Sequence, residues 1–172
     1  MRLVGGVDWV AFQRGRYRPP DEAGWTFNSY TGARFALGAF VRPGAGTVSL
    51  GLRPSYALTV GAGKTESFLQ QDKTAVAHAL YLPIVFSMDA LRDSWGTVRA
   101  DIDAGYVHSW VFQSPTSPLS TNGGGFGLGV ETLFKTSHSV AVGPRLAASG
   151  YASEVWLFSV FLGITVDLLP LE

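Results

Sequence analysis

The chain has 172 residues with 13 basic and 13 acidic side chains, so its formal net charge is zero. This balance gives no indication of nucleic acid as a partner. Charged residues make up 15% of the sequence, against about 25% in an ordinary soluble domain. The length predicts one domain over residues 1–172, and the absence of cysteine excludes disulfides and thiolate metal sites.

No segment has the features of a transmembrane helix or of a signal peptide. No run reaches the roughly 18 apolar residues that a spanning helix needs. The opening stretch, MRLVGGVDWVAFQ, lacks the apolar run and cleavage site of a signal peptide. We therefore expect either a cytoplasmic chain or one whose targeting segment, or a further domain, was removed before Met1.

Apolar and polar residues alternate with a period of two along the whole chain, which is typical of β-strands. The alternation predicts eight strands, at residues 2–13, 25–42, 47–61, 74–88, 97–113, 125–135, 139–150 and 155–168. Long and short connectors alternate between them, apart from a short last loop. This arrangement indicates an antiparallel, up-and-down sheet.

The two faces of the predicted strands differ sharply in chemistry. In the third strand, TVSLGLRPSYALTVG, bulky apolar residues alternate with small or hydroxylic residues and Arg53. Glycine and alanine weaken a solvent-exposed strand, but they leave room for long side chains inside a narrow tube. We therefore predict that the polar face lines the interior of a closed barrel. Its charged members are Asp8, Arg34, Arg53, Arg99, Asp101, Asp103, Glu131, Lys135, Arg145 and Asp167.

The apolar face carries Trp and Tyr mainly near strand ends, as on a lipid-facing surface with aromatic girdles. Closure of the sheet would pair every backbone polar group, which hydrocarbon requires. The predicted fold is therefore all-β: an eight-stranded antiparallel up-and-down transmembrane β-barrel, polar inside, with its apolar face to lipid.

In this pattern the chain resembles the small eight-stranded bacterial outer-membrane barrels, such as the transmembrane domain of outer membrane protein A. The resemblance covers nearly the whole chain and includes the last strand, FLGITVDL. There Gly163, Val166 and Leu168 match the spacing of the family's assembly signal, although aliphatic residues replace its usual aromatics. The resemblance implies a bacterial outer-membrane location, and external long connectors would place both termini on the periplasmic side.

Three prolines, Pro54, Pro83 and Pro144, fall inside predicted strands. Each removes one hydrogen-bond donor from the ladder, so we expect a bulge or a local opening at each.

The interior charges have two interpretations: a salt-bridge network that fills the lumen, or a selective aqueous pore. Eight strands enclose a space that side chains can fill, which favours the network. Arg99, Asp101 and Asp103 share one strand face and could meet Arg53 or Arg145 across the lumen.

His78 and His108 are predicted on the lipid face near the outer rim, where they could contact lipid headgroups. A register sum of 186 would set them directly opposite each other. Metal binding and catalysis are the alternatives, because some lipid-modifying barrels of this size carry a His–Ser–acid set. Ser109 points to the opposite face from His108, and no acid is suitably placed. No catalytic residue, metal site or cofactor is therefore predicted.

The sequence thus predicts a non-enzymatic membrane anchor, scaffold or accessory subunit of an envelope assembly. Its partners would be membrane lipid and a protein bound through the external loops or the barrel wall. The alternatives are an outer-leaflet lipid-modifying enzyme, a small-solute pore and a soluble lipocalin-type carrier. The inverted polarity of the faces and the lack of a Gly-x-Trp opening count against the carrier.

Overall fold

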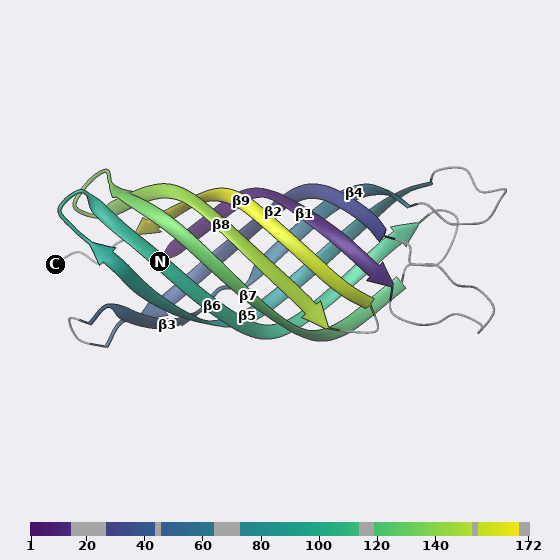
Figure 1. Cartoon of the computed structure of the whole chain (residues 1–172), viewed down its shortest axis with the longest axis horizontal. Helices are drawn as coiled ribbons and strands as arrows, with labels where there is room; N and C mark the ends of the chain where they lie inside the picture. Colours follow the sequence, from purple (N-terminus) through teal and green to yellow (C-terminus); the bar gives the residue numbers. More distant parts are fainter. Residues whose placement is uncertain (15–26, 44–45, 64–72, 114–118, 153–154, 169–172) are drawn as a thin grey trace.

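The computed structural model describes residues 1–14, 27–43, 46–63, 73–113, 119–152 and 155–168, which form one closed sheet (Figure 1). The strands are β1 (Arg2–Arg14), β2 (Phe27–Val41), β3 (Val48–Leu52), β4 (Ser55–Gly63), β5 (Lys73–Arg92), β6 (Gly96–Gln113), β7 (Leu119–Lys135), β8 (Val140–Ala152) and β9 (Val155–Leu168). All pairings are antiparallel, and β1 pairs with both β2 and β9, which closes the ring. Because β3 and β4 are two halves of one strand, the predicted eight-stranded barrel is confirmed.

Two segments that were predicted as connectors belong largely to strands in the structure. The connector expected between the fifth and sixth strands shrinks because β7 begins at Leu119, six residues earlier than predicted. The connector expected at residues 89–96 shrinks because β5 continues to Arg92 and β6 begins at Gly96. A register shift between Asp89 and Leu91 lets β5 continue into a tight turn, which the Asp93–Gly96 backbone bonds close.

The break between β3 and β4 is caused by two prolines, Pro54 and Pro83, which have no backbone N–H to donate. Pro54 lies opposite Leu37 of β2, and Pro83 of β5 lies opposite Arg53, so each pair keeps one of its two backbone bonds. Leu37 N donates to Pro54 O (3.1 Å) and Arg53 N donates to Pro83 O (3.3 Å). The return bonds are missing because proline has no N–H. The expected local opening is therefore present, shared by the two prolines, and the register is unchanged across it.

Pro144 produces a second opening. The β7–β8 ladder is unpaired between the Glu131–Arg145 and Phe134–Val142 pairs, again without a change of register. Proline thus interrupts this sheet as expected, by opening the ladder rather than by a bulge.

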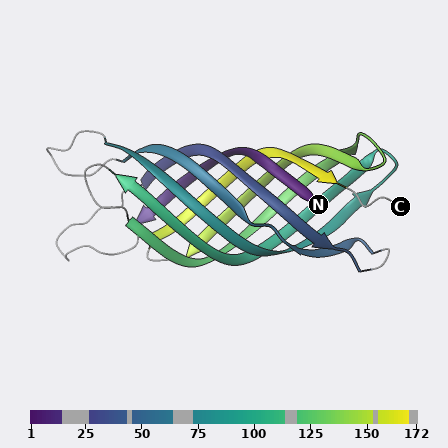
Figure 2. The ribbon, with the colours of Figure 1, turned by 180° about the vertical axis from the view of Figure 1, so that it is seen from behind.

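Both described chain ends lie at one end of the barrel (Figure 2). Leu168 N donates to Met1 O (2.7 Å), and the Met1 ammonium donates to Leu168 O (3.0 Å). The segments 15–26, 64–72, 114–118 and 153–154, predicted as external loops, lie outside the described residues. Within the described ranges, no helix is long and apolar enough to cross a bilayer.

The polarity of the barrel wall is inside-out, as predicted. Leu50, Ile102 and Leu162 face outward and are 53%, 54% and 64% exposed. Arg53, Arg99 and Arg145 alternate with such residues and are 7%, 4% and 3% exposed. The lumen, rather than the outer surface, therefore holds the charge.

Candidate functional site: the charged lumen

All eight residues predicted for the interior network lie in the lumen, each with 9% of its surface or less exposed. They are Arg34, Arg53, Arg99, Asp101, Asp103, Glu131, Arg145 and Asp167. They come from five strands and from the break between β3 and β4, so opposite walls of the barrel meet through them.

Arg99 is the centre of the network near the chain ends. Its Nε donates to Asp89 Oδ1 at 2.6 Å. Its Nη1 donates to Glu131 Oε1 at 3.0 Å and to Asp167 Oδ2 at 2.9 Å. One guanidinium thus joins three carboxylates that lie on three other strands. Charge-assisted bonds of this kind are the strongest side-chain hydrogen bonds in proteins.

Asp101 is the centre one step further along the lumen. Arg145 binds both of its oxygens, at 2.6 and 2.9 Å. Arg53 also binds both, at 3.0 and 3.2 Å, and reaches Asp103 at 2.7 Å. Because Arg145 also donates to Glu131 at 3.1 Å, the two centres form one network. The predicted meeting of strand β6 acids with Arg53 and Arg145 across the lumen is what the structure shows.

A separate ion pair in the lumen joins β1 and β2. Arg34 Nε donates to Asp8 Oδ2 at 3.0 Å. Its Nη2 donates to Ser159 Oγ at 2.7 Å and to Tyr151 Oη at 3.1 Å. Ser159 Oγ in turn donates to Asp8 Oδ1 at 2.6 Å. This pair is fully hydrogen-bonded by residues outside the larger network.

Glycines of β7 make the space for these side chains. A Cβ on Gly127 would lie 2.5 Å from Asp103 Oδ1, and one on Gly129 would lie 2.3 Å from Arg145 Nη2. A Cβ on Gly125 would lie 2.6 Å from the Tyr151 ring. The lumen-facing glycines of the run TNGGGFGLG therefore leave the space that these side chains occupy.

An aromatic and apolar layer lies next to the charges. Tyr81 and Tyr151 stack edge to face with centroids 5.2 Å apart. Tyr81 Oη donates to Asp103 Oδ1 at 2.7 Å, which ties this layer to the charged network. The layer consists of Val10, Tyr30, Ala77, Tyr81, Val107 and Tyr151.

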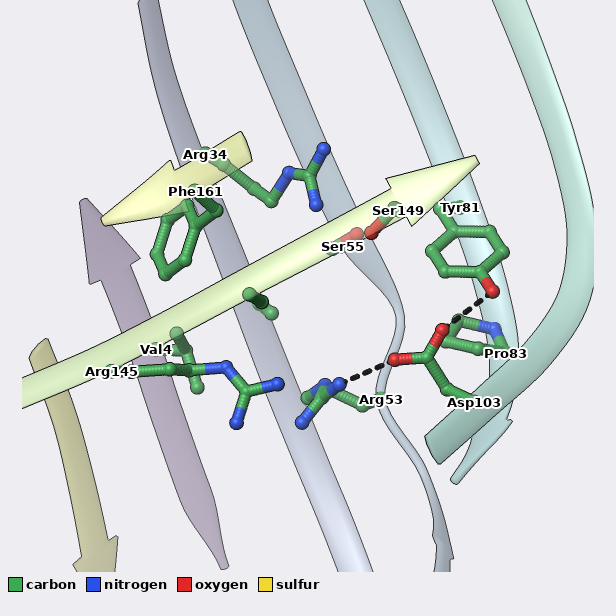
Figure 3. A pocket seen from close by; sticks show the side chains of 12 residues that line it. Val4, Arg34, Arg53, Ser55, Tyr81, Pro83, Asp103, Arg145, Ser149 and Phe161 are labelled. Carbon is green, nitrogen blue, oxygen red and sulfur yellow. Dashed lines mark hydrogen bonds and ion pairs between the residues drawn. The ribbon is translucent and has the colours of Figure 1, made fainter. Parts of the chain in front are cut away.

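A cavity of about 30 Å³ remains between the two sets of ion pairs (Figure 3). Arg34, Arg53, Asp103 and Ser149 contribute polar atoms to its lining. A polar space of this size has room for one or two water molecules. It is too small for an organic solute.

Sequence reasoning missed three members of the network. Arg2 lies 3.5 Å from Glu131 and 3.6 Å from Asp167, and its guanidinium lies 3.9 Å above the Phe40 ring. Asp89 also binds Arg42 at 2.7 Å. Arg2 had the right strand parity, whereas Asp89 was assigned to a connector because the strand was predicted to end at residue 88, four residues before the end of β5. Lys135, expected in the lumen, is exposed at the end of β7.

The network is electrically balanced. Its members are Arg2, Arg42, Arg53, Arg99 and Arg145 with Asp89, Asp101, Asp103, Glu131 and Asp167. All its cations are arginines, whose planar donors suit several carboxylates at once. Among the described residues, no group of three His, Cys, Asp or Glu side chains could hold a metal ion.

His78 and His108 lie on the outer wall, but they are not directly opposite each other. The structure pairs His78 with Trp110 and His108 with Leu80, a register sum of 188 instead of 186. The tight turn at residues 93–96 and the shift at Asp89 set this register. His78 Nδ1 hydrogen-bonds Tyr56 Oη, whereas His108 contacts side chains of β7.

The predicted assembly signal lies on the strand that closes the ring. Gly163 pairs with Gly6 of β1 and Arg145 of β8, and Val166 pairs with Leu3 and Val142. Leu168 pairs with Val140 beside Met1. Its role in assembly stays a prediction.

No protein-family model matches the sequence, and no curated protein matches it. Solved structures do. OprG from Pseudomonas aeruginosa is 8% identical with a TM-score of 0.57, over 98% of this chain and 95% of that one. The neisserial surface protein NspA is 9% identical with a TM-score of 0.52, over 97% of each chain. The chain therefore has the fold of the small eight-stranded outer-membrane barrels, as the resemblance predicted.

Proposed function

We propose that the protein is an outer-membrane barrel that acts as a sealed platform, an anchor, scaffold or accessory subunit of an envelope assembly. The observation that carries this proposal is the lumen. Ten charged side chains from across the barrel neutralise one another there, and the tyrosine layer continues the filling. A barrel filled in this way has its outer wall and its ends free for function.

The proposed orientation has both termini in the periplasm. It is supported by the position of Met1 and Leu168 at the end opposite Arg14 and Gly63, the strand ends that precede the longer connectors in the sequence. Epitope tags at either terminus should resist protease added to intact cells. Tags within residues 15–26 or 64–72 should be cut.

Planar-bilayer recording tests the sealed platform against the small-solute pore. The purified chain should insert without a steady ion current, because the arginine–carboxylate bonds bridge the lumen. A variant with Arg53→Ala and Arg145→Ala together should conduct, because it opens the network next to the cavity. A steady ohmic current through the unaltered chain would instead establish the pore.

Co-purification in mild detergent tests the scaffold role. A protein retained by the complete chain at constant stoichiometry would identify the assembly. A chain that remains alone after chemical cross-linking in its native membrane would contradict the scaffold role.

A further inference from the structure

Four polar side chains gather on the outer wall, at the barrel end away from the chain termini. Tyr106 and His108 come from β6, and Ser120 and Asn122 come from β7. We call these four residues the wall cluster. The register pairs His108 with Asn122 and Trp110 with Ser120, so neighbouring strands place the four on one face. Ser120 and Asn122 are exposed, and His108 is half-buried.

A chain of hydrogen bonds runs through the wall cluster. Ser120 Oγ lies 3.2 Å from His108 Nε2, and His108 Nδ1 hydrogen-bonds Asn122 Oδ1. Tyr106 Oη donates to the same Asn122 oxygen at 2.8 Å. A serine, a histidine and a hydrogen-bond acceptor in this order are the arrangement that activates a serine hydroxyl.

The arrangement of the wall cluster corresponds to one tautomer of His108. With the Asn122 oxygen facing His108, the His108 Nδ1 atom acts as the donor in this bond. The Nε2 atom is then the free acceptor that faces the Ser120 hydroxyl. A histidine that acts as a general base toward serine needs this tautomer.

The surroundings of the wall cluster fit a lipid substrate. The rings of Trp110 and His108 pack edge to face with centroids 4.1 Å apart, and tryptophan favours the boundary between hydrocarbon and headgroups. The ester carbonyls of membrane lipids lie at that boundary. Below it, exposed Phe126 and Leu128 continue the apolar wall on β7, where an acyl chain would lie.

We propose that the wall cluster is a hydrolytic site for acyl esters of membrane lipids. Ser120 Oγ attacks the ester carbonyl carbon while its proton passes to His108 Nε2. The carbon–oxygen bond to the alcohol then breaks, and the alcohol leaves with that proton. Water, deprotonated by His108, attacks the acyl-Ser120 ester. This step releases the fatty acid and restores the serine hydroxyl.

The site is distinct from the one that sequence reasoning set aside. Ser109 is a buried residue on the lumen side of β6, so it was rightly excluded as a partner of His108. The partner is Ser120, which was assigned to a connector. The acceptor is an amide rather than an acid, so a search for Asp or Glu could not find it.

The test uses the complete chain in two lipid environments. One is a vesicle of phosphatidylethanolamine and phosphatidylglycerol, and the other is lipopolysaccharide, and released fatty acid is measured by mass spectrometry. Release from the vesicles assigns a glycerophospholipid substrate, and release from lipopolysaccharide alone assigns an acylated saccharide. A fluorophosphonate probe should also label the chain, with the adduct on the peptide that contains Ser120.

Variants separate chemistry from folding. Ser120→Ala and His108→Gln should each lower fatty-acid release at least about 100-fold. Ser137→Ala and His138→Ala, in an exposed turn at the other end, should leave it unchanged. Retained heat-modifiable gel mobility shows that each variant is folded.

Asn122 is a positioning residue, because it acts through His108. Asn122→Ala should lower release and change the pH profile, whereas Asn122→Asp should restore release by keeping the acceptor oxygen. The proposal is overturned if the unaltered chain releases no fatty acid from either lipid. It is also overturned if folded Ser120→Ala releases as much as the unaltered chain.

Discussion

The lumen network and the wall cluster are both polar groups on strands, but they differ in charge and exposure. In the network, each arginine binds buried carboxylates, so removal of one partner leaves a buried charge. In the wall cluster, the side chains are neutral in the arrangement described and lie at the surface. The comparison teaches that two similar sets of hydrogen-bonded side chains can have different roles. The first should control stability, and the second should control chemistry.

The largest effect is expected from the centre of the network. Arg145→Met leaves Asp101 with Arg53 alone and removes one cation from Glu131. We expect the free energy of unfolding to fall by about 3–5 kcal/mol, measured by urea titration in phospholipid vesicles. Lys135→Met, which removes an exposed cation, should change it by less than about 0.5 kcal/mol. Equal losses of unfolding free energy in the two variants would show that the buried network stabilises the barrel no more than an exposed cation does.

The isolated Asp8–Arg34 pair can be compared with the larger network inside the same lumen. Arg34→Met should cost about 3 kcal/mol, because the Asp8 charge then keeps only Ser159 as a side-chain donor. Asp8→Ala in the same chain should recover part of this loss, because no charge is then left unpaired. Addition of Asp101→Ala to Arg145→Met should recover nothing, since it leaves Arg53 with fewer acceptors. The same urea titration measures all four variants, and recovery in the second pair would show that the network is not continuous.

Two adjacent glycines of β7 test how tightly the lumen is filled. Gly125→Ala places a Cβ 2.6 Å from the Tyr151 ring and 2.8 Å from the Tyr81 ring. This overpacking should cost about 1–3 kcal/mol. Gly124→Ala faces outward with no atom within 4 Å, and it should be neutral or slightly stabilising. Thermal unfolding of the two variants side by side decides this, and equal midpoints would contradict a filled lumen.

The smallest effect on stability is expected from the wall cluster. The double variant Ser120→Ala and His108→Gln should change the free energy of unfolding by less than about 1 kcal/mol, since exposed neutral hydrogen bonds contribute little. Urea titration in vesicles measures this as well. A loss comparable to that of Arg145→Met would mean that the wall cluster holds the barrel together.

The period-two alternation was sufficient for the fold because side-chain direction in a strand depends only on parity. It assigned Arg53, Arg99 and Arg145 to one face, and closure of the sheet placed that face inside. Strand ends were harder to predict because a tight turn and a register shift depend on backbone geometry. Asp89 and Ser120 were therefore assigned to connectors.

The pairing of residues between neighbouring strands was the other feature that was hard to predict from the sequence. The partners of His108 depend on register, and a shift of two residues changes which side chains it meets. Sequence reasoning tested the neighbour of His108 along the chain, Ser109, whereas the structure supplies Ser120 and Asn122 from the next strand. Parity predicts the face of a residue, and only the register predicts its neighbours.

The central claim is that apolar side chains of the barrel wall face outward and charged side chains face the lumen. A nitroxide scan tests this claim most directly. Because the chain has no cysteine, single cysteines at residues 81–88 can be spin-labelled one at a time in phospholipid vesicles. Oxygen accessibility should oscillate with a period of two, with maxima at residues 82, 84, 86 and 88 and minima at 81, 83, 85 and 87. Maxima at the odd positions, or no oscillation at all, would contradict the account.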